Sequence, residues 1–308
     1  DVLKEIPDLL RIRHQLYRYF RANPPDVFIG VDAPDFNFTL EKKLKRKGIK
    51  TIHYVSPSIW AWRKGRIKKI KRAVDHILTL FPFEPEIYKA AKVKASYVGH
   101  PMADEIPLSP DVDDARAQLK LGRHAKIIAM LPGSRLGEVR QHADLFIKTA
   151  QNIAKDCPES LFLVPLLTRE TRNIFEDALF QNYYQRPEEA QPNIQILFGH
   201  SHLAMQAADF VLVASGTATL EAALLKKPMV ITYRVPRLSW QLLKRMNYLP
   251  WVGLPNILAK RFVVPELLQD EATPDNLANT MMEMMSNQSL DRKSTRLNSS
   301  HVKRSRMP

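Results

Sequence analysis

The sequence lacks several features that would narrow its class. It contains one cysteine, Cys157, so an internal disulfide is excluded and a reducing compartment is favoured. No apolar run approaches the roughly 18 residues of a membrane-spanning helix. No G-x-x-x-x-G-K-[ST] motif is present, which excludes a P-loop. No cluster of His, Cys or Asp has metal-ligand spacing, since "HSH" at 200–202 offers only two histidines, and no metal site is expected.

Positive charge, in contrast, is abundant. The 308 residues include 46 lysines and arginines against 32 aspartates and glutamates, which gives a net charge of +14. Thirteen basic residues fall within 42–72, and six more lie in the Ser- and Arg-rich segment 291–308. Such a surface attracts phosphate, whether in nucleic acid, anionic lipid or nucleotides. We interpret 291–308 as a disordered or non-native tail, or as an ordinary basic one, and leave it out of the predicted fold.

Apolar β-branched runs alternate with amphipathic segments, and 45% of the residues are hydrophobic, enough for a sizeable core. The predicted strands are 27–31, 51–55, 76–80, 126–131, 161–165, 194–198, 210–214 and 229–233. The predicted helices are 38–47, 66–73, 84–91, 139–156, 170–183, 202–207 and 217–226. Strands that alternate with helices form parallel sheets, and continuously apolar strands are covered on both faces. The sequence therefore predicts a doubly wound α/β fold.

A change of composition at 101–115, with three prolines near a burst of acidic residues, predicts a linker between two domains. The predicted domains are 1–108 and 109–290. The first has only three predicted strands, and the chain begins without a methionine. We therefore expect the first domain to be incomplete, with its opening strands upstream of residue 1.

The "DVDD" sequence at 111–114 allows two interpretations. Asp-x-Asp binds a metal in some enzymes. Acidic residues that follow Ser-Pro and open a helix also cap that helix and suit its dipole. We favour capping.

The junction "MLPGSRLGEVRQH" (130–142) has the composition of an anion site. Gly133 lets the backbone approach a ligand, Ser134 follows it, and Arg135 offers a bidentate donor for phosphate. The N–H groups of the next helix are expected to point at this loop. A plain strand–helix turn with a surface arginine is the alternative.

A second junction of the same kind is "VASGTATLEAALLKKP" (213–228). Ser215, Gly216 and Thr217 stand where a strand ends and a helix begins, which suits a phosphate. Glu221, four residues after Thr217, lies on the same helix face and is placed to accept hydrogen bonds from ribose hydroxyls. The alternative is a first-turn glutamate that merely suits the dipole. Two such junctions in one domain predict a nucleotide site.

The stretch "VFIGVDAPDFN" (27–37) runs from an apolar strand straight into carboxylates. Asp32 stands at the carboxyl end of a predicted parallel strand, where open α/β sheets build their sites. Turn chemistry is the other explanation, because strands commonly stop at Asp and Pro. Asp35 is interpreted as the cap of a helix that begins near Phe38.

Two segments carry apolar residues that suit either a lipid surface or a core. The residues Val2, Leu3, Ile6, Leu9 and Leu10 have nearly helical spacing, and in a globular domain such a stripe is more often core. The segment 236–255 mixes Leu and Trp, among them Trp240 and Leu243, with basic residues. This mixture is typical of an interfacial helix, although a helix that packs between domains fits it as well.

Several stretches together resemble one enzyme family. "DVFIGVDAPDFN", "KTIHYVSPSIWAWRKGRIKKI", "GHPMAD", "LPGSRLGEV", "LVASGTATLEAALLKKPMVITYR" and "LPNILA" closely resemble the lipid-A-disaccharide synthases of Gram-negative bacteria, over residues 1 to about 285. The resemblance implies the GT-B fold, two Rossmann-like domains facing a cleft. It also implies that a Gly-rich loop near the family's N-terminus and its C-terminal helices are missing, as in a fragment truncated at both ends.

The reaction that the resemblance implies joins UDP-2,3-diacylglucosamine to 2,3-diacylglucosamine 1-phosphate with inversion and releases UDP. Asp32 matches the family's proposed general base for the acceptor hydroxyl. Arg135 and the helix start at 215–217 would neutralise the diphosphate, so that neither a metal nor another cofactor is required. Asn256 in "LPN" matches a contact with the donor, with a turn residue as the alternative. The apolar stripe at 2–10 corresponds to a hydrophobic acceptor patch.

The implied partners are the two acylated sugars and an anionic membrane surface, with the protein cytoplasmic and peripheral on the inner face of the inner membrane. No nucleic-acid partner is expected, and a homodimer is left open. One alternative is another GT-B enzyme that acts on UDP-N-acetylglucosamine, against which "VSPSIWAWR" argues. The other is a non-enzymatic basic protein that binds nucleic acid or membranes. The charge at 42–72 favours it, but no recognised nucleic-acid motif accompanies that charge.

Overall fold

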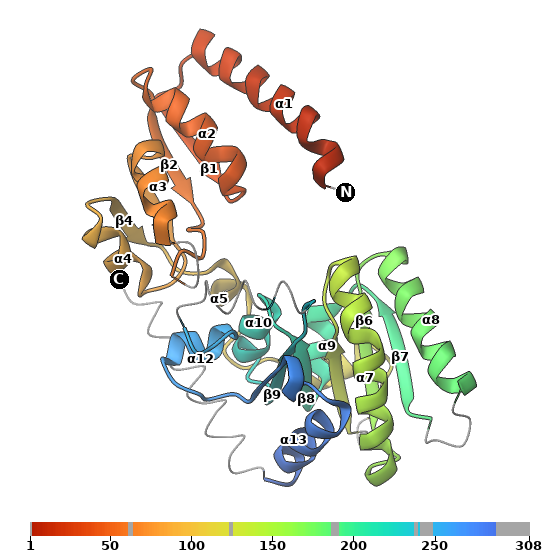
Figure 1. Ribbon diagram of the computed structural model, residues 1–308. Coiled ribbons are helices and arrows are strands. Elements are labelled where there is room, and N and C mark those ends of the chain that lie inside the picture. Colours follow the sequence, from red (N-terminus) through yellow and green to blue (C-terminus); the bar gives the residue numbers. More distant parts are fainter. Residues whose placement is uncertain are drawn as a thin grey trace. The chain divides into compact units, whose positions relative to one another are not determined.

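The computed structural model describes residues 2–60, 64–122, 126–185, 191–236, 240 and 249–287 (Figure 1). The described residues fold into two compact units that divide between Pro101 and Met102. The predicted boundary at 108/109 falls a few residues later and stays a prediction. Helices alternate with parallel strands in both units, which confirms the predicted α/β class.

The first unit is built on a sheet of four parallel strands in the order β1-β2-β3-β4. Its elements are α1 (Val2–Ala22), β1 (Val27–Val31), α2 (Pro34–Lys45), β2 (Lys50–Tyr54), η1 (Lys64–Arg66), α3 (Ile67–Ala73), β3 (His76–Thr79), α4 (Glu84–Ala90) and β4 (Lys94–Tyr97). The prediction of three strands is wrong, because the structure adds a fourth, β4. Its sequence, KASY, alternates polar and apolar residues, so no apolar run marks it as a strand.

One of the core clusters of the first unit lies on one side of β1. Leu40 and Leu44 of α2 are fully buried, and Phe28 of β1 and Phe20 of α1 pack against them. The expectation that β1 is covered on both faces is wrong for this structure, because its remaining apolar side chains, Val27, Ile29 and Val31, are 39–58% exposed.

The second unit contains a six-stranded parallel sheet in the order β10-β9-β8-β5-β6-β7. After α5 (Pro101–Glu105), its elements are α6 (Val112–Gln118), β5 (Ile127–Leu131), α7 (Leu136–Asp156), β6 (Leu161–Leu166), α8 (Arg169–Gln185), β7 (Asn193–Phe198), α9 (Ser201–Ala207), β8 (Phe210–Ala214), α10 (Ala218–Leu224), β9 (Met229–Tyr233), α12 (Leu254–Ala259), β10 (Glu266–Leu268), η2 (Gln269–Glu271) and α13 (Pro274–Ser286). The chain moves outward from β5 through β6 to β7, then returns to β8 on the other side of β5. The strand order therefore reverses between β5 and β8.

Both faces of this second sheet are covered, as continuously apolar strands predict (Figure 1). Because side chains alternate along a strand, Ile128 and Met130 of β5 belong to one core cluster and Ile127 and Ala129 to another. The first cluster takes in residues of α7, α8 and α13, and the second takes in residues of α6, α9 and α10. The parallel β5, with every residue buried, is thus enclosed between two helical layers.

The start of α6 confirms the capping interpretation of the acidic run. Asp111 is the N-cap residue, and its side chain accepts a hydrogen bond of 3.0 Å from the backbone N–H of Asp114. The same helix is tied to the sheet by Arg116, whose guanidinium donates to the carbonyl of Ala207 and to Asp209 Oδ2.

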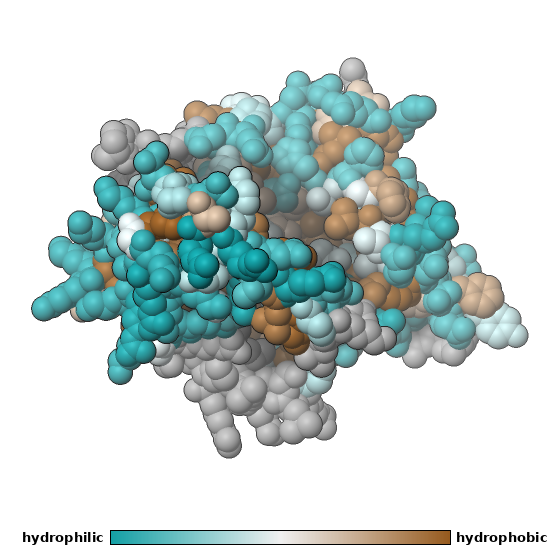
Figure 2. Space-filling view, turned by 90° about the horizontal axis from the view of Figure 1, so that it is seen from above, coloured by the Kyte–Doolittle hydropathy of each residue, from teal (hydrophilic) through white to brown (hydrophobic). Residues whose placement is uncertain are grey.

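The face drawn in Figure 2 is mostly hydrophilic, and the hydrophobic residues on it form separate, smaller patches. Within the described ranges, the structure contains no helix that is both long enough and apolar enough to cross a membrane.

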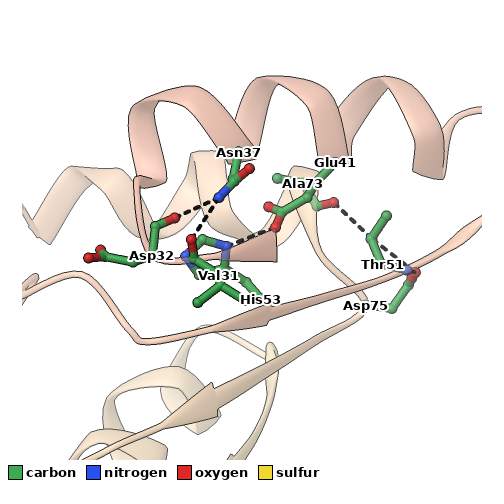
Figure 3. A network of polar contacts seen from close by, with 8 residues as sticks. All are labelled: Val31, Asp32, Asn37, Glu41, Thr51, His53, Ala73 and Asp75. Carbon is green, nitrogen blue, oxygen red and sulfur yellow. Dashed lines mark hydrogen bonds and ion pairs between the residues drawn. The ribbon is translucent and has the colours of Figure 1, made fainter. Parts of the chain in front are cut away.

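A buried glutamate–histidine pair connects α2 to β2 in the first unit. Both side chains have zero exposure, and His53 Nδ1 lies 2.8 Å from Glu41 Oε1 (Figure 3). Burial raises the pKa of Glu41, and the hydrogen bond with His53 opposes that rise. Glu41 Oε2 and His53 Nε2 have no hydrogen-bond partner among the described residues. A Cβ on Gly30 would lie 2.1 Å from Glu41 Oε1, so the carboxylate occupies the space that this glycine leaves.

We expect Gly30→Ala to lower the free energy of unfolding by about 1–3 kcal/mol, because the added methyl group must push Glu41 away from His53 in a packed core. Urea denaturation measures the change. Gly65→Ala is the matched control, since a Cβ there meets nothing within 4 Å, and it should stay within about 0.5 kcal/mol of the parent. Equal denaturation midpoints for the two variants would show that Glu41 moves aside without cost.

Candidate functional site

The reversal of strand order in the second unit creates a pocket at the carboxyl edge of its sheet. Leu131 at the end of β5 is paired with Val213 near the end of β8, so the loops that follow the two strands begin side by side. Crevices outside a switch point of this kind are where open α/β sheets bind ligands. The pocket measures about 550 Å³ and is lined by Leu131, Gly133, Ser134, Arg135, Glu138, Pro165, Leu166, Leu167, Gly199, Ser201, Ala214, Ser215, Gly216, Thr217, Ala218, Glu221 and Tyr233. Both predicted anion loops and Glu221 therefore meet in one pocket.

The loop after β5 is closed by a glutamate of its own helix. Gly133 has a φ of +128°, and a Cβ there would lie 2.4 Å from the Cβ of Glu138, so the position requires glycine. Glu138 Oε2 accepts hydrogen bonds from the backbone N–H groups of Ser134 and Arg135, at 3.0 and 3.3 Å. These two N–H groups, which precede the helix, are therefore not free for a ligand. The Arg135 side chain is 83% exposed and contacts Glu138 through Nη1. Its other guanidinium N–H groups remain available as hydrogen-bond donors.

The loop after β8 is more open. Gly216 has a φ of +151°, and the N–H of Ser215 continues the sheet by donating to the carbonyl of Thr232. Within the described part of the chain, the N–H groups of Gly216, Thr217 and Ala218 donate to no protein acceptor. All three residues line the pocket. This loop therefore presents unused donors to a ligand, which the first loop does not.

Glu221 lies on the first turn of α10 and lines the pocket. Its Oε1 is 2.8 Å from His202 Nδ1, on the second residue of α9. From the sequence, this histidine stands out only as one of the two in "HSH" at 200–202, with no role predicted for it. The signal that could have marked it as a site residue is its position shortly after the carboxyl end of the parallel strand β7.

One further residue that the sequence did not indicate, His142, packs against the pocket residue Tyr233. His142 of α7 is fully buried, and its Nε2 accepts a hydrogen bond of 3.0 Å from the N–H of Arg234. Its Nδ1 must then carry the proton that is shared with the carbonyl of Glu138, 2.8 Å away. Burial lowers the pKa of His142, which favours this neutral form. The first turn of α7 is thereby tied to the end of β9, next to the pocket residue Tyr233.

Asn256 does not line this pocket. Its side chain has zero exposure, Nδ2 donates to the carbonyl of Val264 and to Glu266 Oε1, and Oδ1 accepts from the N–H groups of Val263 and Val264. Glu266 also accepts from the N–H groups of Val252 and Gly253, and burial raises its pKa. The amide is therefore occupied in joining α12 to the strand β10. This geometry does not support the predicted contact with a donor.

In the first unit, Asp32 lies on the surface at the carboxyl end of β1. It has a φ of +48° and Ala33 one of +40°, two successive left-handed residues that are not glycine. Asn37 stabilises this turn, because its Nδ2 donates to the carbonyls of Val31 and Asp32 at 3.1 and 2.8 Å (Figure 3). The N–H of Asp32 continues the sheet by donating to Tyr54. The backbone of Asp32 is therefore fixed while its carboxylate is left to solvent.

Asp35 is not a helix cap. The helix α2 begins at Pro34, four residues before the predicted start, and Ala33 is its N-cap without a side-chain hydrogen bond. The carboxylate of Asp35 instead receives two hydrogen bonds from Arg66 Nη2, at 2.8 and 2.9 Å, lies 3.8 Å from Lys69 Nζ and is largely exposed. The prediction failed because proline at the first helical position is a stronger start signal than an internal aspartate.

Aromatic side chains gather at the same sheet edge as Asp32. Trp60 makes edge-on contacts with Phe81 and Phe83, at centroid distances of 6.3 and 5.4 Å. Its Nε1 donates to Glu84, whose other oxygen accepts from the N–H groups of Leu80 and Phe81. The loops after β2 and β3 are thus joined by one buried carboxylate, and burial raises its pKa.

The predicted apolar surfaces are only partly described. On α1, Ile6, Leu9 and Leu10 are 40–48% exposed, so they are not core residues of the first unit as described. The side chains of Val2 and Leu3 lie outside the described residues, as does Leu243. Trp240 is half-buried.

The comparisons with known proteins agree on one family. The family model for lipid-A-disaccharide synthetase matches residues 1–307. The lipid-A-disaccharide synthase of Methylobacillus flagellatus is 62% identical over 290 residues, which cover 94% of this chain and 75% of the relative. That of Azoarcus sp. is 56% identical over 281 residues, 91% of this chain and 71% of the relative.

Solved structures of low sequence identity share the fold. The MnaA–UDP co-structure from S. aureus has a TM-score of 0.65 at 12% identity and covers 99% of this chain and 80% of that one. UDP-GlcNAc 2-epimerase from Neisseria meningitidis, bound to UDP-GlcNAc, has a TM-score of 0.63 at 13% identity and covers 96% and 79%. The family model and the close relatives show that the chain belongs to the lipid-A-disaccharide synthetase family, whose members are glycosyltransferases, and the solved structures share its GT-B fold.

Proposed function

We propose that this chain transfers a 2,3-diacylglucosaminyl group from UDP-2,3-diacylglucosamine to 2,3-diacylglucosamine 1-phosphate, with release of UDP. The observation that carries the proposal is the pocket at the strand reversal, which gathers both anion loops and Glu221 in a chain of this family. Two proteins of the same fold are solved with UDP and with UDP-GlcNAc, which supports a UDP-sugar as the donor.

The residues of the pocket suit the nucleotide end of that donor. The unused N–H groups of residues 216–218 and the free donors of Arg135 are available to the diphosphate, whose negative charge grows as UDP leaves. The partly free carboxylate of Glu221 is available to the ribose. Because cationic and N–H groups of the protein compensate the charge, we expect the reaction to need no added divalent metal.

Asp32 is proposed as the general base for the acceptor. Inversion by in-line displacement requires a group that takes the proton of the attacking hydroxyl, and an exposed carboxylate on a fixed backbone meets that requirement. Its carboxylate makes no ion pair with any described residue, unlike that of Asp35, so it is free to accept a proton.

The two acylated substrates also require access to a lipid surface. We propose peripheral attachment to the inner face of the inner membrane, through apolar residues such as Leu9 and Leu10 together with the basic segment 42–72. The interfacial role of Trp240 and Leu243 stays part of this proposal, and a homodimer stays open.

The test of the reaction is an assay of UDP release with both acylated glucosamines present. Release that depends on both substrates is the expected result. Release from UDP-N-acetylglucosamine, with none from the diacylated donor, would favour the alternative GT-B enzyme instead.

Asp32→Asn should lower kcat by about 10²- to 10⁴-fold, because the amide cannot take the proton of the acceptor hydroxyl. UDP affinity, measured by calorimetry, should remain unchanged. Asp35→Asn is the control at a neighbouring carboxylate already paired with Arg66, and its kcat should change by no more than a few-fold. A normal kcat for Asp32→Asn would remove this residue from the mechanism.

Glu138→Gln should bind UDP several-fold more tightly, because it removes a negative charge beside the proposed diphosphate position, worth about 1 kcal/mol at short range in water. The same variant should lose about 0.3–1 kcal/mol of stability, since a carboxylate suits the helix start better than an amide. Calorimetry and thermal denaturation measure the two effects. The control Glu176→Gln, at an exposed pair with Arg172, should leave UDP binding unchanged. Weaker binding by a folded Glu138→Gln protein would show that UDP needs this carboxylate.

Vesicle co-sedimentation tests the membrane proposal. Binding should require anionic lipid, because each basic residue near the membrane surface contributes about 1 kcal/mol of attraction. Salt should weaken the binding without abolishing it, because only the electrostatic part is screened. Leu10→Ser should weaken vesicle binding by roughly fivefold, which corresponds to about half the free energy of burying a leucine side chain. Leu108→Ser is a matched control, because both leucines are 48% exposed. Equal binding by the two variants would exclude α1 from the membrane contact.

A further inference from the structure

We propose that His202 is a positioning residue for nucleotide recognition: it holds one oxygen of Glu221, so that the other is presented to the ribose hydroxyls. This inference rests on the proposed donor pocket. It assigns a task to a side chain that does not itself line the pocket.

The first observation is that only one of the two Glu221 carboxylate oxygens has a hydrogen-bond partner. Oε1 lies 2.8 Å from His202 Nδ1, while Oε2 has no hydrogen-bond partner in the described part of the protein. The side chain is 15% exposed, and Glu221 is one of the residues that line the pocket. One oxygen is therefore committed to the protein and one is available to a ligand.

The second observation is how the backbone brings His202 to this place. Gly199 and His200 follow β7 with φ values of +70° and +57°, a left-handed turn from which α9 starts at Ser201. Gly199 and Ser201 line the pocket. His202 comes next on α9 and reaches Glu221 on α10, so the contact joins the loop after β7 to the helix after β8. The imidazole is 44% exposed, and its only hydrogen bond among the described residues is the one between Nδ1 and Glu221.

The physical consequence is pre-organisation. A free glutamate loses the rotational freedom of three side-chain torsions when a ligand fixes it. A hydrogen bond to one oxygen removes part of that freedom in advance, so less affinity is lost on binding.

The test compares the affinities of UDP and 2′,3′-dideoxy-UDP by calorimetry. The parent protein should prefer UDP by about 10- to 100-fold, the range expected for hydrogen bonds to a charged group. Glu221→Ala should abolish the preference. His202→Ala should lower UDP affinity by roughly 3- to 10-fold and leave the dideoxy affinity unchanged, which a merely structural role would not do.

His202→Asn is the rescue variant, because its side-chain amide nitrogen takes nearly the place of Nδ1 and can donate to Glu221. It should restore most of the preference, and thermal denaturation should show both His202 variants folded. If His202→Ala keeps the full preference for UDP over 2′,3′-dideoxy-UDP, the inference is overturned. UDP binding by the same variant would still support the donor pocket. A parent protein that does not bind UDP would overturn the proposed function and, with it, this inference.

Discussion

The reversal of strand order between β5 and β8 is the constraint on which the proposed donor pocket depends. Hydrogen bonding in parallel fixes the register of the two strands, so the loops after them begin at the same height. The apolar side chains on both faces exclude any other register, because a slip of one residue would exchange the two core clusters. The polar residues of the pocket are thus positioned by contacts that are themselves almost entirely apolar.

The two loops at this reversal perform different tasks, although both follow a strand and open a helix. The first is already filled by Glu138, which completes the start of a 21-residue helix, α7. His142, one turn further on, fixes the end of β9. The second loop opens a short helix and leaves its N–H groups unused. One loop is built for rigidity and contributes mainly Arg135, whereas the other contributes backbone donors.

The strands β5 to β9 of the second unit and the two loops that meet in its pocket could be predicted from the sequence, because long apolar runs and Gly-Ser or Ser-Gly junctions are local signals. β4 and β10 could not, since strands of four and three residues without an apolar run carry no such signal. The role of Glu138 was missed because a glutamate three residues into a helix can serve either its own helix or a ligand, and only geometry decides. The internal role of Asn256 was missed for a similar reason. Its four partners come from residues 263–266, and nothing in "LPN" indicates them.

The buried pair of Glu41 and His53 has a consequence for how this sequence can change. Removing either partner leaves a polar group buried without compensation, and enlarging Gly30 displaces the carboxylate. Replacing both partners by apolar residues of similar volume is often tolerated in protein interiors. Substitutions at positions 30, 41 and 53 should therefore be strongly epistatic, with single changes counter-selected and compensated combinations permitted. Among homologues, these three positions should vary together or not at all, and the turn that carries Asp32 depends on the same helix and strands.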